Sequence, residues 1–225
     1  MRPVYRDHNM KQAASQELFS YWNQVRGSRM EPERAELNPG SIRGVLANTF
    51  ILEVDPDLLF PMRIAGTRLG TLFTSDVKGH NFMDLWQADA REPIHELLAT
   101  VLDDRSPALA GVVSSPPGFP PLELELLLLP LRHFGKTHSR IIGSMAPCFI
   151  PSWLGIVRSP GLQLTSMRII RRPADLLQAN LAVGETESGK TQRFGHLTVL
   201  EGGLADNDAR TSGSGAAEND NKAPW

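Results

Sequence analysis

The chain has 225 residues, 41% of them hydrophobic, which is enough for one sizeable domain with extensions. A formal net charge of −2 gives no basis for binding nucleic acid or an anionic membrane. The single cysteine, Cys148, excludes an intrachain disulfide and a thiolate metal cluster, and we interpret it as an inert, partly buried thiol. A cytoplasmic location is expected, because residues 1–16 lack the apolar run of a signal peptide and no stretch is long enough to span a membrane.

Residues 1–38 are expected to form an arm and one helix ahead of the main domain. A helix over residues 12–26 is indicated because Leu18, Phe19 and Trp22 recur on one side of it. Such a stripe is typical of a helix that covers its own domain. Pairing with a second copy of the chain is the alternative.

The main domain is expected over residues 39–150, and its densest pattern lies in residues 60–86. A short helix should begin at Pro39, with Asn38 as its cap. A strand should follow residue 60, because Met62 and Ile64 alternate with polar or small residues and would share one face.

Two short helical segments are expected after this strand. Thr67 is placed to cap the first segment and Asn81 the second. Aromatic residues recur in both segments and need a surface to cover. Those that we expect to line the inner side of the domain are Phe73, Phe82 and Trp86.

A longer helix is predicted after Asp89, with Glu92 three residues later as in a capping box. Pro93 would then fall in the tolerant first turn. Apolar residues follow the i, i+3, i+4 pattern along the helix, namely Ile94, Leu97, Leu98, Val101 and Leu102.

Five strands are expected around this helical block, and they indicate an α+β domain with an antiparallel sheet. Their ranges are 49–54, 60–67, 108–115, 122–131 and 139–146. In the fourth strand, Leu127 and Leu129 point away from the face that the inner leucines occupy. Because apolar side chains should not stay in water, we expect the N-terminal helix to cover this outer face, in the same chain or across a homodimer.

The chain after the main domain carries a weaker pattern. Residues 151–172 form an extension in which 161–170 could be a further strand or an extended arm. Residues 173–225 are rich in small and polar residues, and we expect them to be mostly disordered. Within them, residues 194–203 alternate in hydrophobicity and could dock as a strand.

Several strings resemble a known family, the PAS domains. They are FPMRIAGTRLGTLF, SDVKGHNFMDLW, ADAREPIHELLATVLDDRSPAL, PLELELLLLPL and RIIGSMAP, between residues 60 and 147. In particular the chain is similar to bacterial proteins built around a single PAS domain. The resemblance implies a five-stranded antiparallel sheet with a helical connector, and a sensory or signalling role without catalytic activity of its own.

A small ligand could occupy the pocket of such a domain. The candidate lining residues are Phe73, Phe82, Trp86, His95 and Leu98. Some PAS sensors bind haem through a histidine on the long helix, which would make His95 an iron ligand. The other interpretation, which we favour, is a half-buried histidine bonded to its neighbourhood, so no cofactor is required.

Residues 184–191, GETESGKT, match the phosphate-loop pattern GxxxxGK[ST]. That loop needs a preceding strand and a following helix, whereas residues 192–195 carry no helical pattern. We therefore interpret the match as fortuitous. A nucleotide-dependent function that uses Gly189, Lys190 and Thr191 remains the third hypothesis.

The sequence thus predicts a non-enzymatic regulatory protein that acts through a signalling protein partner, with a homodimer expected and with no nucleic acid or membrane partner. The candidate partner-binding residues are Leu18, Phe19, Trp22, Leu127 and Leu129. A haem or other cofactor sensor is the alternative function.

Overall fold

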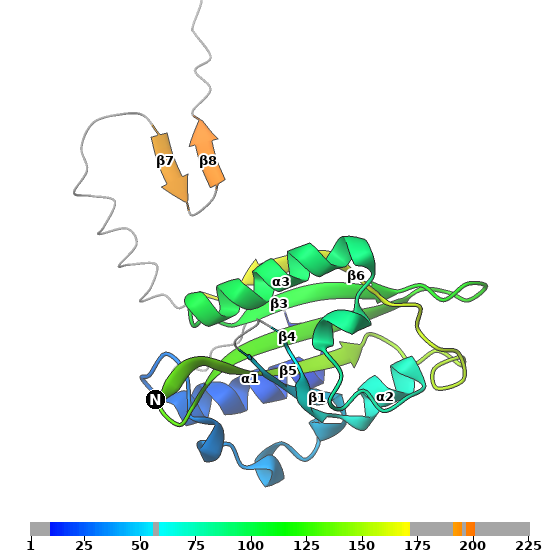
Figure 1. Cartoon of the computed structure of the whole chain (residues 1–225), viewed down its shortest axis with the longest axis horizontal. Coiled ribbons are helices and arrows are strands. Elements are labelled where there is room, and N and C mark those ends of the chain that lie inside the picture. The colour runs from blue at the N-terminus through cyan, green and yellow to red at the C-terminus, as the bar shows by residue number, and fades with distance from the viewer. Residues whose placement is uncertain (1–9, 56–58, 172–190, 195–196, 201–225) are drawn as a thin grey trace, which may run out of the picture. The chain divides into compact units, whose positions relative to one another are not determined.

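The computed structural model describes residues 10–55, 59–171, 191–194 and 197–200. The chain divides into two compact units, residues 1–176 and 177–225. In the first unit a six-stranded antiparallel sheet has the strand order β2-β1-β5-β4-β3-β6 (Figure 1). Its helices are α1 (Ala13–Arg26), α2 (Thr67–Phe73) and α3 (Ala88–Asp103), and its strands are β1 (Thr49–Glu53), β2 (Met62–Ala65), β3 (Ala108–Ser114), β4 (Leu122–His133), β5 (Lys136–Pro147) and β6 (Leu162–Ile169).

All five expected strands form, and the α+β class is confirmed. The sixth strand, β6, pairs antiparallel with β3 along its whole length, so the stretch after residue 160 is a strand and not a free arm. The longest hairpin joins β4 to β5 through Phe134 and Gly135, both with positive φ. Two consecutive positive φ values suit a tight hairpin whose strands twist together.

One face of the sheet, the inner face, is covered by α2, α3 and the short 3₁₀ helix Phe82–Leu85. Its core is a continuous set of buried apolar side chains from these helices and from the inner positions of the strands. At its centre the Phe50 ring stacks on Phe82, 5.2 Å away. Gly143 makes room for this ring, because a Cβ there would lie 2.4 Å from Phe50 Cζ.

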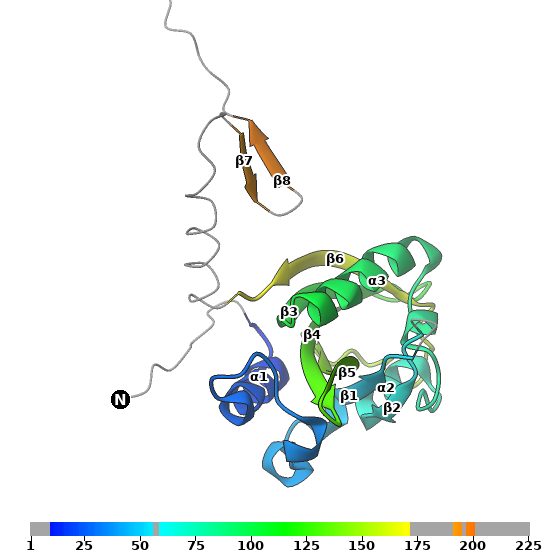
Figure 2. The same cartoon turned by 60° about the vertical axis from the view of Figure 1, so that its left-hand side comes forward.

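The other face, the outer face, is covered by α1. Figure 2 shows the sheet between α1 on one side and α3 on the other. A second apolar cluster joins α1 to the outer positions of β4 and β5. The expected packing of the N-terminal helix on this face is confirmed, and it occurs within the same chain.

The strand pattern of β2 was predicted incorrectly at one point. Met62 pairs with Leu52 and Ile64 with Ile51, so that Arg63 is the extra residue of a bulge. The bulge puts Met62 in the inner core and turns Ile64 to the outer face, where 41% of it is exposed. The two residues therefore do not share a face.

Two helix starts also differ from expectation, whereas the predicted caps Asn38 and Asn81 are confirmed. The cap of α2 is Gly66 instead of Thr67. Helix α3 begins after Gln87, whose backbone N–H donates to Leu162 O at 3.0 Å and fixes the start on β6. Asp89 therefore lies inside the first turn, where a carboxylate still favours the helix dipole.

Because α3 starts earlier than expected, Pro93 lies inside the helix and not in its first turn. Pro93 has no N–H, so one backbone bond of the second turn is missing. The rest of the helix keeps the predicted apolar face, with Ile94 and Leu98 fully buried.

In the second unit, strands β7 (Thr191–Phe194) and β8 (Leu197–Leu200) pair as an antiparallel hairpin. Within residues 194–203, Leu197–Leu200 forms the strand β8 of this hairpin, whereas the docking of that segment stays a prediction. Thr191, the last residue of the phosphate-loop match, begins a strand where that loop requires a helix. The rest of the match and most of the predicted disordered region lie outside the described residues.

Candidate functional site

The surface between α1 and the outer face of the sheet unites all five candidate partner-binding residues. Leu18, Phe19 and Trp22 come from α1, and Leu127 and Leu129 from β4. All five are buried, Leu18 and the two β4 leucines completely. A partner could contact them only if α1 left the sheet, so their role in partner binding stays a prediction.

A carboxylate from the sheet anchors the start of α1. The helix has Gln12 at its N-cap, without a side-chain bond to cap it. Instead the buried Glu125 of β4 accepts from the backbone N–H of Lys11 at 2.7 Å and from that of Gln12 at 3.0 Å. A charged acceptor at a helix N-terminus stabilises it through the exposed amides and the helix dipole.

Two further polar contacts tie the body of α1 to the sheet. Trp22 Nε1 donates to the backbone oxygen of Pro130 at 2.9 Å, inside the apolar cluster. Ser15 Oγ lies 3.4 Å from Ser144 Oγ, and both serines are fully buried. Because both contacts are buried, a displaced α1 would have to exchange them for water.

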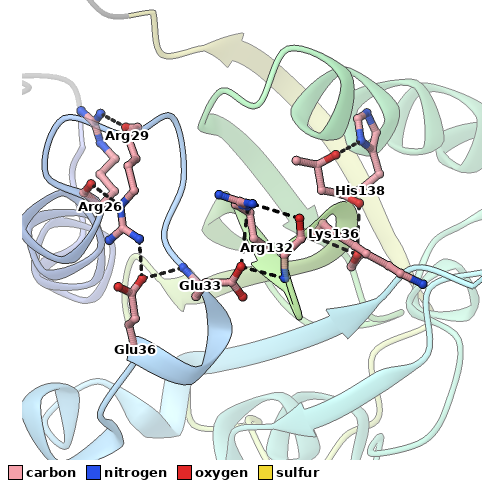
Figure 3. Close-up of polar contacts among 10 residues, drawn as sticks. Arg26, Arg29, Glu33, Glu36, Arg132, Lys136 and His138 are labelled. Atoms are coloured by element: carbon pink, nitrogen blue, oxygen red, sulfur yellow. Dashed lines mark hydrogen bonds and ion pairs between the residues drawn. The ribbon is translucent and has the colours of Figure 1, made fainter.

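The segment after α1 is fastened to the β4–β5 hairpin by charged side chains (Figure 3). Arg29 pairs with Glu36 at 2.9 Å. Glu33 accepts from the backbone N–H of Gly135 at 3.0 Å and lies 3.6 Å from Arg132 Nε. These contacts are at least partly exposed, so they position the segment more than they stabilise it.

Glu31 is the one carboxyl in this segment that is almost fully buried, with 2% of its surface exposed. Burial raises its pKa above the ordinary value of 4.5, against the opposing attraction of Arg105, Arg132 and His138. Its Oε1 has no hydrogen-bond partner among the described residues. The charge of Glu31 therefore attracts residues at the end of α3 and on both strands of the hairpin. Because the carboxyl is buried, its ionised form lowers the stability of the fold.

The predicted ligand pocket is filled by its own side chains in this structure. Phe73, Phe82, Trp86 and Leu98 are all buried, and the Trp86 ring packs edge-on against Phe82 at 5.7 Å. A hollow of about 220 Å³ lies further along the inner face, between α2 and the β4–β5 pair. Its lining includes Leu69, Leu72, Leu122, Leu124, Met145 and Ile150.

His95 is half-buried, as the favoured interpretation expected, and its ring lies 5.8 Å from Phe60 in an edge contact. The hollow on the inner face is smaller than the roughly 300–1,000 Å³ typical of sites for drug-sized ligands, and His95 does not line it. A porphyrin beside His95 would therefore require the aromatic cluster to open. In the described residues the inner face does not fit haem.

Cys148 is exposed, which corrects the expectation of a partly buried thiol. It follows directly after β5, and its backbone N–H donates to Glu123 O. Partial shielding, together with the carboxylates of Glu123 and Glu125, raises the pKa of the thiol. Less thiolate forms at neutral pH, so the thiol is a weak nucleophile although it is accessible.

Two features are absent from the described residues. They contain no group of three or more His, Cys, Asp or Glu side chains arranged to hold a metal ion. None of their helices combines the length and the apolar character that crossing a membrane requires.

The sequence predicts the apolar side of the α1 surface but not its polar anchors. Glu125 lies in a strand of alternating leucines, and nothing in that pattern reveals that its carboxylate meets a helix start. Ser15 and Ser144 are separated by 129 residues and carry no local signal. Glu31 could have been noticed only as a charged residue between two predicted elements.

An antiparallel sheet in the order β2-β1-β5-β4-β3, with a helical connector and one long helix across its inner face, is the architecture expected of a PAS domain. The sequence profile of a PAS domain family matches residues 10–146, more than half of the chain. The chain therefore belongs to the PAS domain family. The matched region includes α1, so the helix that covers the outer face lies within the family's own pattern.

Comparison with solved structures gives a weaker likeness. One similar structure is that of an RNA-binding light-oxygen-voltage receptor, with 14% sequence identity and a TM-score of 0.34. The alignment covers 63% of this chain and only 36% of the receptor. A search among curated proteins found no match. The assignment thus rests on the family profile, and it places the protein among sensory and regulatory PAS proteins.

Proposed function

We propose that this PAS protein has no catalytic activity of its own and regulates a signalling protein partner through the surface between α1 and the sheet. The observation that supports this is the composition of that surface. It contains Phe19 and Trp22, aromatic residues of the type enriched at protein–protein interfaces, and α1 covers the apolar β4 residues Leu127 and Leu129. A helix that shields an apolar surface can be exchanged for a partner or for the α1 of a second copy.

The proposed switch has two states, with α1 on the sheet and with α1 released. A small ligand that enters the inner hollow would move β4 and β5, because Leu124 and Met145 line that hollow. The same strands carry Leu127, Leu129 and Ser144 on the outer face. The ligand can shift the equilibrium only by the difference between its affinities for the two states.

A disulfide that locks α1 in place tests this proposal. The side chains of Ser15 and Ser144 face each other, with their Oγ atoms 3.4 Å apart, so Ser15→Cys and Ser144→Cys is the pair chosen for a bridge, with Cys148→Ser to remove the other thiol. Proteins retained from an extract of the native host are quantified for the oxidised and the reduced form of this variant. The reduced form is the matched control, since it differs only in the bridge.

We expect the oxidised form to lose the partner that the reduced form and the wild type retain, and to stay monomeric. The release variant Trp22→Ala should bind more hydrophobic dye, since it removes the ring and its bond to Pro130. Equal retention of the same proteins by the oxidised and reduced forms would contradict the proposed role of α1.

A further inference from the structure

A groove on the outer face, beside the part that α1 covers, forms a second surface. It runs along β1 and β2 and has an apolar half of about 520 Å³ and a charged half of about 470 Å³. Arg34, Ile51 and Ile64 line both halves, so the two halves are continuous. We name this the β1–β2 groove.

The apolar half has a firm floor and an exposed rim. Ile42, Ile51 and Ile142 are buried in the outer cluster and form its floor. Ile64 and Leu46 at the rim are 41% and 37% exposed. Ile64 reaches this position through the bulge at Arg63, which turns it from the inner core to the outer face.

The charged half carries more positive than negative groups. Arg63 and Arg140 share the carboxylate of Glu53, with Arg140 Nη2 2.9 Å from it. Glu33, the other carboxylate that lines this half, pairs with Arg132 at 3.6 Å. Arg34 stands at the junction of the two halves, and its guanidinium makes no hydrogen bond or ion pair with any residue in the described ranges. An arginine without a partner beside an apolar floor suits a carboxylate that accepts two parallel N–H bonds.

The open shape favours a protein segment over a small molecule. Sites for small ligands bury most of the ligand, whereas this groove is bordered by exposed side chains along its length. Phe134, at the hairpin turn, lines the charged half and is 88% exposed. Exposed aromatic and branched apolar side chains beside arginine are the composition enriched at protein interfaces.

We propose that the β1–β2 groove binds an acidic–apolar segment of a partner protein. A carboxylate of the segment pairs with Arg34, and neighbouring apolar side chains pack on Ile51 and Ile64. This inference rests on the proposed function only in that the protein acts through protein contacts. The groove is open while α1 stays on the sheet, so it needs no release of the helix.

Selection of short random peptides displayed on phage, with the full chain as bait, tests the proposal. The selected peptides are then synthesised and titrated against the wild type, Arg34→Glu and Ile64→Lys. Matched controls are Arg158→Glu and Ile156→Lys, because both residues are exposed and line neither half of the groove. We expect the selected peptides to carry Asp or Glu next to branched apolar residues.

Arg34→Glu should weaken binding by about tenfold or more, since a charged hydrogen-bonded pair is lost, and Ile64→Lys should weaken it as well. Both controls should bind like the wild type. Replacing the peptide's acidic residue with lysine should restore binding to Arg34→Glu. The disulfide-locked form should bind the same peptides equally, which separates this test from that of α1 release.

Three results would overturn the proposal. The first is a selection that yields no acidic–apolar peptides or peptides insensitive to Arg34→Glu. The second is a dimer of the wild type that Ile64→Lys dissociates while no peptide binds, which would assign the groove to a second copy. The third is saturable binding of decanoate at Arg34 without peptide binding, which would assign the groove to a small amphiphile.

Discussion

The two faces of the sheet are covered in different ways. On the inner face, α2 and α3 contribute to a large apolar core whose aromatic rings stack on one another and on the strands. On the outer face, α1 adds a smaller apolar cluster and is held by polar contacts at its start and along its length. The inner cover is part of the domain core, whereas the proposed function requires the outer cover to be a layer that can separate from the sheet.

The largest difference in the free energy of unfolding is expected between two leucine variants, one under each cover of the sheet. Leu98 of α3 and Leu18 of α1 are both fully buried. We expect Leu98→Ala to lower the free energy of unfolding by about 2–5 kcal/mol, the usual cost of truncating a core leucine. Leu18→Ala should cost less in urea unfolding, because its loss cannot exceed the free energy that holds α1 to the sheet.

Equal losses for the two leucine variants, with equal changes in the urea dependence, would mean that α1 unfolds together with the core. Hydrogen exchange gives a second comparison. Leu18→Ala should speed exchange in α1 alone, whereas Leu98→Ala should speed it in α3 and in the strands.

A substitution at Gly143 tests how tightly the inner core is packed. An added Cβ would lie 2.4 Å from Phe50 Cζ and 2.6 Å from Leu127 O, so ring and strand would have to move apart. We expect Gly143→Ala to lower the free energy of unfolding by about 1–3 kcal/mol, as overpacked cores do. Thermal unfolding measures this, and an unchanged melting temperature would show that the Phe50 ring can shift freely.

Glu125 tests the polar anchor of the outer face. Glu125→Ala removes the acceptor from the amides of Lys11 and Gln12, which should cost about 0.5–2 kcal/mol, as the loss of a helix cap does. Glu123→Ala is the matched control, since Glu123 lies two residues away on the same face and is exposed. If both variants lose the same stability by urea unfolding, Glu125 does not anchor α1.

The smallest effect is expected at Glu31. Because its pKa is raised in the folded chain, its carboxyl is neutral in both states well below pH 4.5 and becomes a cost as the pH rises through the folded value. Glu31→Gln should therefore raise the melting temperature at neutral pH, with a gain that vanishes on acidification. A melting temperature that falls at neutral pH, with the loss vanishing on acidification, would show that the attraction of Arg105 and Arg132 outweighs burial.

The sequence predicted most of the fold because its signals are local and periodic. The alternation of leucines in β4 correctly assigned Leu127 and Leu129 to the outer face, opposite the leucines of the inner core. The apolar stripe of α1 then had one large surface to cover. The predictions were wrong where a shift of one or two residues changed the alternation or the helix boundary, as at the bulge of Arg63 and the early start of α3.

Little of the candidate site could be predicted in the same way. The anchors of α1 join residues more than 100 positions apart, and such pairs produce no recognisable pattern in the sequence. The β1–β2 groove depends on the bulge, because an unbroken strand would have kept Ile64 on the face of Met62. Such features become visible only when the register of the sheet is known.

Native-state hydrogen exchange of the wild-type chain, measured at increasing sub-denaturing urea, tests the central claim most directly. If α1 is a separable cover, its amides will exchange through an opening of lower free energy and weaker urea dependence than those of α3 and β4. A common free energy and a common urea dependence for α1, α3 and β4 would show one cooperative unit, and would contradict a regulatory role for the release of α1.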